Sequence, residues 1–250
     1  MKRLLAPFAA LAALLMSASA LSAEVSVAVA ANFTAPMQKI AAAFEQATGH
    51  KAQLAFGSTG RFYAQVKNGA PFQVLLAADD ETPAKLVTEG LAIGASRFTY
   101  ATGRLVLWSA SPGVVDAQGE VLKKPDIPRL AIADPKLAPY GAAAIETLTK
   151  LNLLPAWQPR IVQGENIAQA YQFVSTGNAP IGFVALSQVM NDGRIDKGSA
   201  WVVPENLHAP IRQDAVILNT GKDSPAATAL LQFLRSDAAR TIIRAHGYQL

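Results

Sequence analysis

The feature that most constrains the fold is a repeated pattern in which a short apolar run is followed at once by a segment with helical periodicity. Residues 25–29, 52–56 and 74–77 are apolar runs of strand length, and after the first run Met37, Ile40 and Phe44 recur at helical spacing. The run 74–77 is apolar throughout, as expected for a strand covered on both faces. Strands that alternate with helices in this way predict an α/β fold with mostly parallel sheets flanked by helices.

The same pattern begins again in the second half of the chain. Further strands are expected at 129–133, 161–162 and 181–184, with helices at 140–151 and 167–176 between them. Two more strands, at 104–108 and 214–218, flank this unit, and we expect both to cross between two lobes. The sequence therefore predicts lobe I from residues 24–103 and 217–250, lobe II from residues 104–216, and a cleft at the crossover.

The first residues have the pattern of an export signal. Lys2 and Arg3 precede an apolar run at 4–16 and then small residues, which is typical of a secretory signal peptide. A membrane anchor is the weaker alternative, because this run is shorter than the ~20 residues that span a bilayer. Cleavage fits after Ala20 or after Ala23. We expect Ala23, and so a signal peptide over residues 1–23, because Glu24 then begins directly with a strand.

Charge and composition exclude several classes of protein. The chain has 22 Lys and Arg residues against 18 Asp and Glu, and without Lys2 and Arg3 its net charge is about +2. The remaining basic residues are scattered singly, which argues against nucleic-acid binding. The sequence contains no Cys, so disulfides and Cys-ligated metals are excluded. The three histidines, His50, His208 and His246, are far apart and are expected at the surface.

Four strand-to-helix junctions have the composition of an anion site, at residues 30–34, 56–61, 134–141 and 163–167. The first N–H groups of a helix have no partner within the helix, and the helix dipole adds partial positive charge there. Asn32 suits an N-cap position, while Ser58 and Thr59 add hydroxyl donors beside two glycines. Plain capping is the alternative at any one junction. Their recurrence favours the interpretation as an oxyanion site.

The motifs of common nucleotide-binding and hydrolytic sites are missing from the sequence. Residues 57–60 are not followed by the Gly-Lys-Ser/Thr of a P-loop and do not have the spacing of a nucleophile elbow. No Ser or Thr has a His or Lys at a recognised motif spacing, so a hydrolase or transferase is a distant alternative. The acids at 79–81 are expected to cap a helix over 83–89 rather than to bind a metal.

Six runs resemble, in sequence and in order, the periplasmic molybdate-binding proteins of ABC importers. They are VSVAVAANFT at 25–34, FGSTG at 56–60, GAPF at 69–72, AIADP at 131–135, APIGFV at 179–184 and GY at 247–248. The similarity spans the whole mature chain. It implies a two-lobed, type II periplasmic binding protein fold, in which each lobe is a mostly parallel sheet flanked by helices and two strands cross over.

The resemblance also implies a function and a setting. The protein would be a binding protein in the periplasm and not an enzyme, would need no cofactor, and would present molybdate or tungstate to the permease of an importer. We expect a monomer that does not insert into the membrane after signal cleavage. Binding proteins for sulfate or phosphate are the alternatives, since the sequence does not give the size of the cavity.

The site residues that the resemblance implies come from four loops, and molybdenum would be present only within the bound oxyanion. They are Ala31 and Asn32 in the first loop, Ser58 or Thr59 in the second, Tyr140 in the third and the backbone N–H of Ile167 in the fourth. Some family members have a ligand Tyr where this chain has Ala185, and the Tyr140 hydroxyl would replace it. Asp134 and Glu165 border the expected site, with their orientation left open. Arg61 points either to the rim of the cleft or into solvent from its helix, and we expect the latter. An inward carboxylate would weaken the expectation of neutral donors, which discriminate against protonated phosphate.

Overall fold

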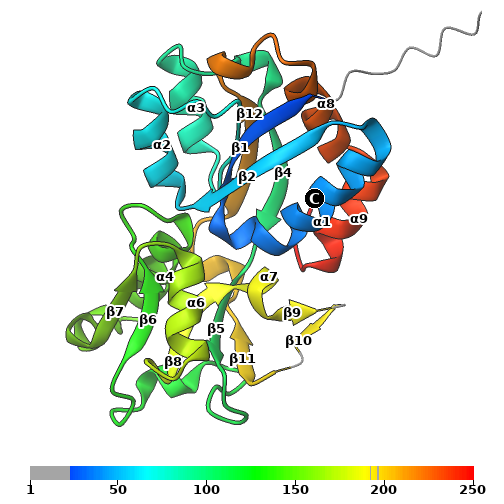
Figure 1. Cartoon of the computed structure of the whole chain (residues 1–250). Helices are drawn as coiled ribbons and strands as arrows, with labels where there is room; N and C mark the ends of the chain where they lie inside the picture. Colours follow the sequence, from blue (N-terminus) through cyan, green and yellow to red (C-terminus); the bar gives the residue numbers. More distant parts are fainter. Residues whose placement is uncertain (1–22, 192, 196) are drawn as a thin grey trace, which may run out of the picture.

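The computed structural model describes residues 23–191, 193–195 and 197–250. The expected signal peptide and the alternative cleavage point after Ala20 therefore lie outside the described residues, apart from Ala23. Two lobes lie one above the other in Figure 1, and the chain ends in the upper lobe. None of the helices in the described ranges is long and apolar enough to cross a membrane.

The upper lobe is built on a five-stranded sheet. In order across the sheet its strands are β2 (Lys51–Gly57), β1 (Glu24–Ala30), β3 (Val74–Leu76), β12 (Ile211–Ile217) and β4 (Phe98–Gly103). β1 pairs in parallel with both β2 and β3, while β12 runs antiparallel to β3 and β4. The sheet thus has one reversed strand, and this is the strand that enters from the other lobe.

The lower lobe repeats this arrangement. Its sheet runs in the order β7 (Ile161–Gly164), β6 (Leu130–Ala133), β8 (Ile181–Ala185), β5 (Leu105–Ser109) and β11 (Ser199–Val202). β6 pairs in parallel with β7 and β8, and β5 is antiparallel to β8 and β11. β9 (Met190–Asn191) and β10 (Arg194–Ile195) form a separate hairpin.

The chain passes between the lobes twice, in short connections before β5 and before β12. Only Arg104 separates β4 from β5, and residues 203–210 join β11 to β12. The two expected crossing strands therefore each belong to a single sheet, because the crossing itself lies in the connection. The division into lobe I (24–103 and 217–250) and lobe II (104–216) stays a prediction. The pairing of β12 favours a return to the first sheet by Ile211 rather than at 217.

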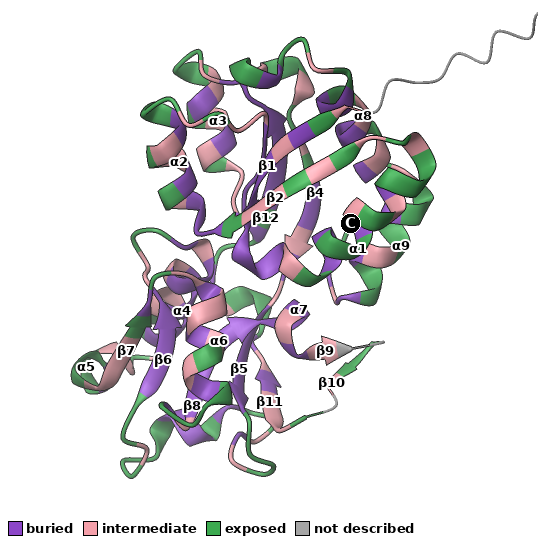
Figure 2. Cartoon of the chain, in the orientation of Figure 1, coloured by how far each residue is buried: buried purple, intermediate pink, exposed green. Residues whose placement is uncertain are grey.

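Helices cover both sheets (Figures 1 and 2). The α-helices are α1 (Thr34–Thr48), α2 (Thr59–Lys67), α3 (Glu81–Thr88), α4 (Pro139–Lys150), α5 (Leu154–Trp157), α6 (Ile167–Ser175), α7 (Leu186–Val189), α8 (Pro225–Leu234) and α9 (Asp237–Ala245). The 3-10 helices are η1 (Ala31–Phe33), η2 (Gly94–Ser96), η3 (Glu120–Lys123), η4 (Gln158–Arg160), η5 (Glu205–Leu207) and η6 (Asn219–Gly221). The prediction of two α/β lobes, each with a sheet flanked by helices, is confirmed. Each sheet is mixed, with two parallel and two antiparallel pairings, because one of its strands is reversed.

Apolar periodicity accounts for the packing on the sheets. Met37, Ile40 and Phe44 of α1 are buried against one face of the first sheet, while Phe62 of α2 and Leu86 of α3 pack on the other. β3 is buried at every position, as its continuous apolar run predicts. α1 ends at Gly49, whose φ of 74° is accessible to glycine at little cost.

Two of the three histidines are not at the surface, and that prediction is wrong for them. His208 and His246 are 5% and 7% exposed, and the Nδ1 atom of each lies 2.7 Å from a backbone carbonyl oxygen, that of Ala209 and Ile242 respectively. His50 is partly buried, and its Nδ1 accepts the N–H of Ala23.

Candidate anion-binding site

A small cavity of about 10 Å³ lies between the two lobes. Its lining residues come from the four junctions singled out in the sequence and from the end of β3, and they include all six expected site residues. They are Ala30, Ala31, Asn32, Gly57, Ser58, Thr59, Ala78, Ala138, Pro139, Tyr140, Asn166 and Ile167. The fold thus brings together every residue that the sequence analysis placed in the site.

The start of a helix faces the cavity from each of the four junctions. η1 begins at Ala31 and continues into α1, and α2 follows Ser58, all in the upper lobe. In the lower lobe, α4 begins at Pro139 and α6 at Ile167. The positive ends of four helix dipoles therefore converge on one space, which favours an anion. Not every N–H group there is unpaired, because the Gly60 N–H of α2 donates to the Leu137 carbonyl of the other lobe at 2.9 Å.

Two of these helix starts show how donors are kept available to the cavity. Ser58 is at the N-cap of α2, yet its hydroxyl makes no capping hydrogen bond although the residue is only 5% exposed. In α6 the Asn166 side-chain oxygen accepts the N–H groups of Ala168 and Gln169, at 2.9 and 3.1 Å. That cap does not use the N–H of Ile167. Neither the Ser58 hydroxyl nor the Ile167 N–H therefore takes part in a helix cap.

Thr59, the alternative to Ser58, is engaged within its own lobe. Its Oγ1 accepts the N–H of Ala78 at 2.9 Å, which ties the start of α2 to the end of β3. The sequence did not decide whether Ser58 or Thr59 contacts the anion. The Thr59 hydroxyl is used in a hydrogen bond within its lobe, whereas the Ser58 hydroxyl makes no capping hydrogen bond.

Asn32 does not cap a helix, and the capping alternative is wrong for this residue. η1 has Ala30 at its N-cap with no side-chain cap. The Asn32 Nδ2 instead donates to the Oε1 of Gln213 and to the hydroxyl of Tyr248, both at 2.9 Å. Both of these partners were missed in the sequence, because they lie 181 and 216 residues away along the chain.

Tyr140 places its hydroxyl in the same buried cluster. The hydroxyl accepts a hydrogen bond from the Nε2 of Gln213 at 3.1 Å. Burial raises the pKa of Tyr140 well above its ordinary value, and Tyr248 nearby adds to the shift. Burial likewise raises the pKa of Tyr248 to about 12. Both hydroxyls are therefore neutral at pH 7 and keep their protons for hydrogen bonding.

No residue that lines the cavity in the described part of the chain carries a formal charge. The three charged neighbours are occupied elsewhere. The Asp134 carboxylate accepts the N–H of Lys136 at 2.9 Å, at the turn before α4. Arg61 and Glu165 form an ion pair of 3.0 Å that joins the two lobes, with side chains 60% and 68% exposed. The sequence left the orientation of Asp134 and Glu165 open, and neither residue lines the cavity.

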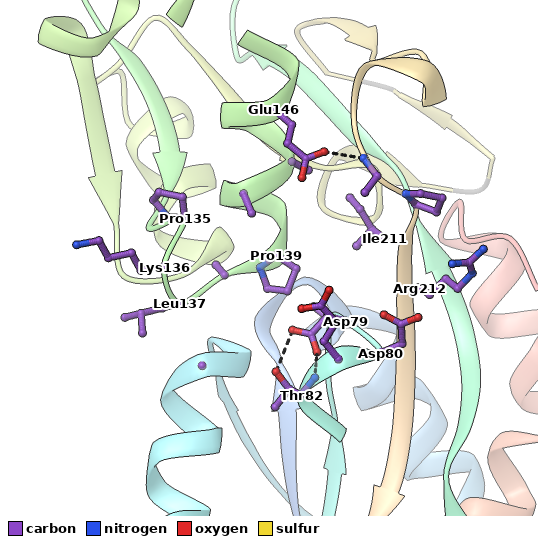
Figure 3. Close-up of a pocket in the computed structure, with 18 residues that line it drawn as sticks. Asp79, Asp80, Thr82, Pro135, Lys136, Leu137, Pro139, Glu146, Ile211 and Arg212 are labelled. Atoms are coloured by element: carbon purple, nitrogen blue, oxygen red, sulfur yellow. Dashed lines mark hydrogen bonds between the residues drawn. The ribbon is translucent and has the colours of Figure 1, made fainter. Parts of the chain in front are cut away.

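A larger hollow of about 380 Å³ lies beside the second crossover, but its charge does not suit an anion (Figure 3). Its lining has four acidic residues, Asp79, Asp80, Glu81 and Glu146, against the two basic residues Lys136 and Arg212, and this excess of acidic groups disfavours an oxyanion. Glu146 accepts the N–H of Ala209 at 2.7 Å, as Figure 3 shows. The small uncharged cavity is therefore the candidate site.

The expected capping role of the acids at 79–81 holds only for Asp79, because α3 runs over Glu81–Thr88 rather than 83–89 and its N-cap residue, Asp80, makes no side-chain cap hydrogen bond. Both carboxylate oxygens of Asp79 accept hydrogen bonds from Thr82, from its N–H at 2.8 Å and its hydroxyl at 3.2 Å. Burial, with the nearby charges of Glu81 and Asp80, raises the pKa of Asp79 to about 6. Among the described residues, no group of three or more His, Cys, Asp or Glu is placed to hold a metal ion.

This architecture is that of a solute-binding protein: two α/β lobes enclose a cavity that has no charged lining residue and that the starts of four helices face. The family model of bacterial extracellular solute-binding proteins matches residues 25–249, and the chain belongs to this family. The predictions of a two-lobed binding-protein fold and of a binding protein rather than an enzyme are confirmed by this membership.

Within this family, the chain is similar to proteins named as molybdate-binding proteins. The chain is 60% identical to the molybdate-binding protein ModA of Azotobacter vinelandii over 96% of both chains, and 53% identical to ModA of Rhodobacter capsulatus over 92% of this chain and 89% of that one. The solved periplasmic molybdate-binding protein of A. vinelandii superposes with a TM-score of 0.87 at 42% identity, covering 90% of this chain and 99% of that chain. The resemblance given by the six sequence runs is thereby confirmed.

Proposed function

We propose that this protein captures molybdate or tungstate between its two lobes in the periplasm and delivers the anion to the permease of an ABC importer. The observation that carries the proposal is the small cavity at which four helix starts, two from each lobe, meet without a charged side chain. The relatives named as molybdate-binding proteins, at 60% and 53% identity over nearly the whole chain, support the choice of ligand.

The donors of this cavity match an oxyanion that is a hydrogen-bond acceptor at every oxygen. We assign the contacts to the main-chain N–H groups of Ala31, Asn32, Tyr140 and Ile167 and to the hydroxyl of Ser58, with Thr59 supporting the second loop. Each hydrogen bond to a charged acceptor contributes about 1.5–3 kcal/mol, which together offset the loss of the anion's hydration. The side chains of Asn32 and Tyr140, which the resemblance implied as ligands, are not assigned to the anion, because they are hydrogen-bonded to Gln213 and Tyr248.

The lining also bears on the alternative ligands. Phosphate carries a proton at pH 7, and no carboxylate of the described lining is available to accept it. Sulfate, like molybdate, accepts at every oxygen, so the two would be separated by the size of the closed cavity. In this proposal the mature protein is a monomer that needs no cofactor and contains molybdenum only as the bound oxyanion. It inserts into no membrane and binds no nucleic acid.

Thermal unfolding in the presence of molybdate, tungstate, sulfate and phosphate at equal concentrations tests the proposal. A ligand at 100 times its Kd stabilises the native state by about 2.7 kcal/mol. For a chain of this size that raises the Tm by about 5–11 °C. We expect the rise with molybdate and tungstate and a much smaller one with phosphate. A Tm unchanged by molybdate and tungstate but raised by sulfate would reassign the ligand.

A further inference from the structure

A cluster of uncharged polar side chains is buried beside the anion cavity and joins the two lobes. At its centre is Gln213 of β12, which is 0% exposed. Its Oε1 accepts hydrogen bonds from Asn32 at 2.9 Å and Tyr100 at 3.0 Å, and its Nε2 donates to Tyr140 at 3.1 Å. Asn32 and Tyr100 belong to the upper lobe and Tyr140 to the lower, so one amide group bridges the lobes.

The chemistry of the amide explains why a glutamine stands at this position. Gln213 must accept from donors on one side and donate to a hydroxyl on the other, and a neutral primary amide presents both functions on adjacent atoms. A leucine could do neither, and an ionised glutamate could not donate to Tyr140. Because the group is fully buried, every unmade hydrogen bond here would leave a polar atom without water.

The backbone around Gln213 is shaped to bring these groups together. The pairing of β12 with β4 shifts register between Gln213 and Asp214, so that Gln213 faces Ala101, Asp214 faces Thr99, and Tyr100 has no partner opposite. Irregularities of this kind re-aim side chains, often next to functional sites. Here the irregularity lies where Tyr100 and Gln213 meet.

Gly103, the last residue of β4 before the first crossover, leaves the room that the lobe-to-lobe contact needs. A Cβ atom on Gly103 would lie 2.0 Å from the Tyr140 hydroxyl and 2.6 Å from the Gln213 Nε2. Gly103 and Gln213 do not line the anion cavity, whereas Tyr140 does. The hydroxyl end of Tyr140 therefore lies at the crossover, while the first turn of α4, which contains its N–H, is at the cavity.

We propose that Gln213 is a positioning residue that sets anion affinity without touching the anion, by holding Asn32 and Tyr140 in the relative position at which their N–H groups converge. The inference rests on the proposed function, because Asn32 and Tyr140 matter here as parts of the anion site. A second contact between the lobes supports the same geometry. The Ser187 hydroxyl donates to the Asn32 carbonyl at 2.8 Å and lies 3.0 Å from the Tyr248 hydroxyl.

The test is a double-mutant cycle on the full mature chain, with molybdate affinity measured by calorimetric titration. Gln213→Leu and Tyr140→Phe each remove the lobe-to-lobe hydrogen bond, and we expect each to raise Kd by about 10-fold or more. Gln213→Leu removes this contact together with the hydrogen bonds from Asn32 and Tyr100, so adding Tyr140→Phe removes no further contact with Gln213, and the double variant is expected to bind about as weakly as Gln213→Leu alone. Multiplicative effects of the two substitutions would overturn the proposal.

Gln73→Leu is the matched control. The Gln73 Oε1 accepts the N–H of Ser26 at 3.0 Å within the upper lobe, far from the second sheet. This variant should lose thermal stability and keep its Kd within about twofold. A comparable loss of affinity in Gln73→Leu would mean that any weakened upper lobe binds poorly, which would also overturn the proposal.

Gly103→Ala keeps the inference testable if Gln213→Leu does not fold. It leaves every polar group of the cluster in place and crowds only the Tyr140–Gln213 contact. We expect a Kd at least 10-fold higher, and wild-type affinity in this variant would refute the inference. The two proposals fail separately: a wild-type protein that does not bind molybdate refutes the proposed function, whereas tight binding by both wild type and Gln213→Leu refutes only the role of Gln213.

Discussion

Ser58→Ala should weaken anion binding and leave the stability of the anion-free protein almost unchanged. Ordinarily a serine at an N-cap stabilises its helix, and replacing it with alanine costs about 1 kcal/mol. Ser58 is at the N-cap of α2, but its hydroxyl makes no capping hydrogen bond. The residue lines the cavity and is 5% exposed. We infer that this hydroxyl is reserved for the anion.

The size of the effect follows from the hydrogen bond that is lost. A neutral donor to a charged acceptor contributes about 1.5–3 kcal/mol, and each 1.4 kcal/mol is a factor of ten in Kd. Ser58→Ala should therefore raise the Kd for molybdate by about 10- to 150-fold. The Tm without anion should change by less than about 2 °C, because no cap is removed.

Ser224→Ala is the matched control, because Ser224 is a serine that does cap. Its Oγ accepts the N–H of Ala227 at 3.2 Å at the start of α8. This variant should lose about 1 kcal/mol of stability, or about 2–4 °C of Tm, with an unchanged Kd. Calorimetric titration gives the Kd of each variant, and thermal unfolding gives the Tm of each. If Ser58→Ala lost Tm like Ser224→Ala while keeping its Kd, Ser58 would be a structural cap and our reasoning about it would be refuted.

Two further predictions concern charged groups near the cleft. The pKa of Asp79 in the folded protein is raised, to about 6 from 3.8, so its contribution to stability is present below pH 4 and is lost as the pH rises through 6. Asp79→Asn should therefore have the same free energy of unfolding as the wild type near pH 4 and a free energy of unfolding about 2–3 kcal/mol higher at pH 8. Urea unfolding across this pH range measures the difference. An equal gain in stability at both pH values would contradict the prediction. Arg61→Ala removes an exposed ion pair with Glu165 and should raise Kd by less than about fivefold, with the effect shrinking in 0.5 M salt; a salt-independent loss of 50-fold would place Arg61 in the site.

Local sequence was sufficient to predict the loops of the anion cavity. Each of them is a short strand followed by a helix, and strand, turn and helix start all lie within a few neighbouring residues. The junctions at 56–61 and 163–167 could be found in this way because a helix start exposes its N–H groups wherever the helix lies in the fold. The assignment of Ser58 and Ile167 as contact residues was implied by the family resemblance. Convergence of the loops did not follow from these local patterns; it was expected from the family resemblance and is seen in the cavity lining.

The buried cluster beside the cavity could not be predicted, because its members meet only after both crossovers have formed. Tyr248 and Gln213 reach Asn32 from distant parts of the chain, and nothing near them in sequence indicates a shared partner. The expected histidine exposure failed for the same reason, since burial at a turn depends on what packs over it. β4 was not predicted either. Its sequence, FTYATG, mixes polar and apolar residues, and only one residue separates it from β5.

The repeated topology explains why the site and the crossovers lie together. In each sheet the parallel strands direct their carboxyl ends, and so the helix starts that follow, toward the other lobe, as is usual for ligand sites in open α/β sheets. The one reversed strand of each sheet, β5 or β12, is the strand that has just arrived from the opposite lobe. β12 consequently runs beside the anion loops, and a side chain on it can contact residues of both lobes. Gln213 occupies that position, so a change in the angle between the lobes must alter its contact with Tyr140. We therefore expect lobe closure and anion binding to be coupled through this strand.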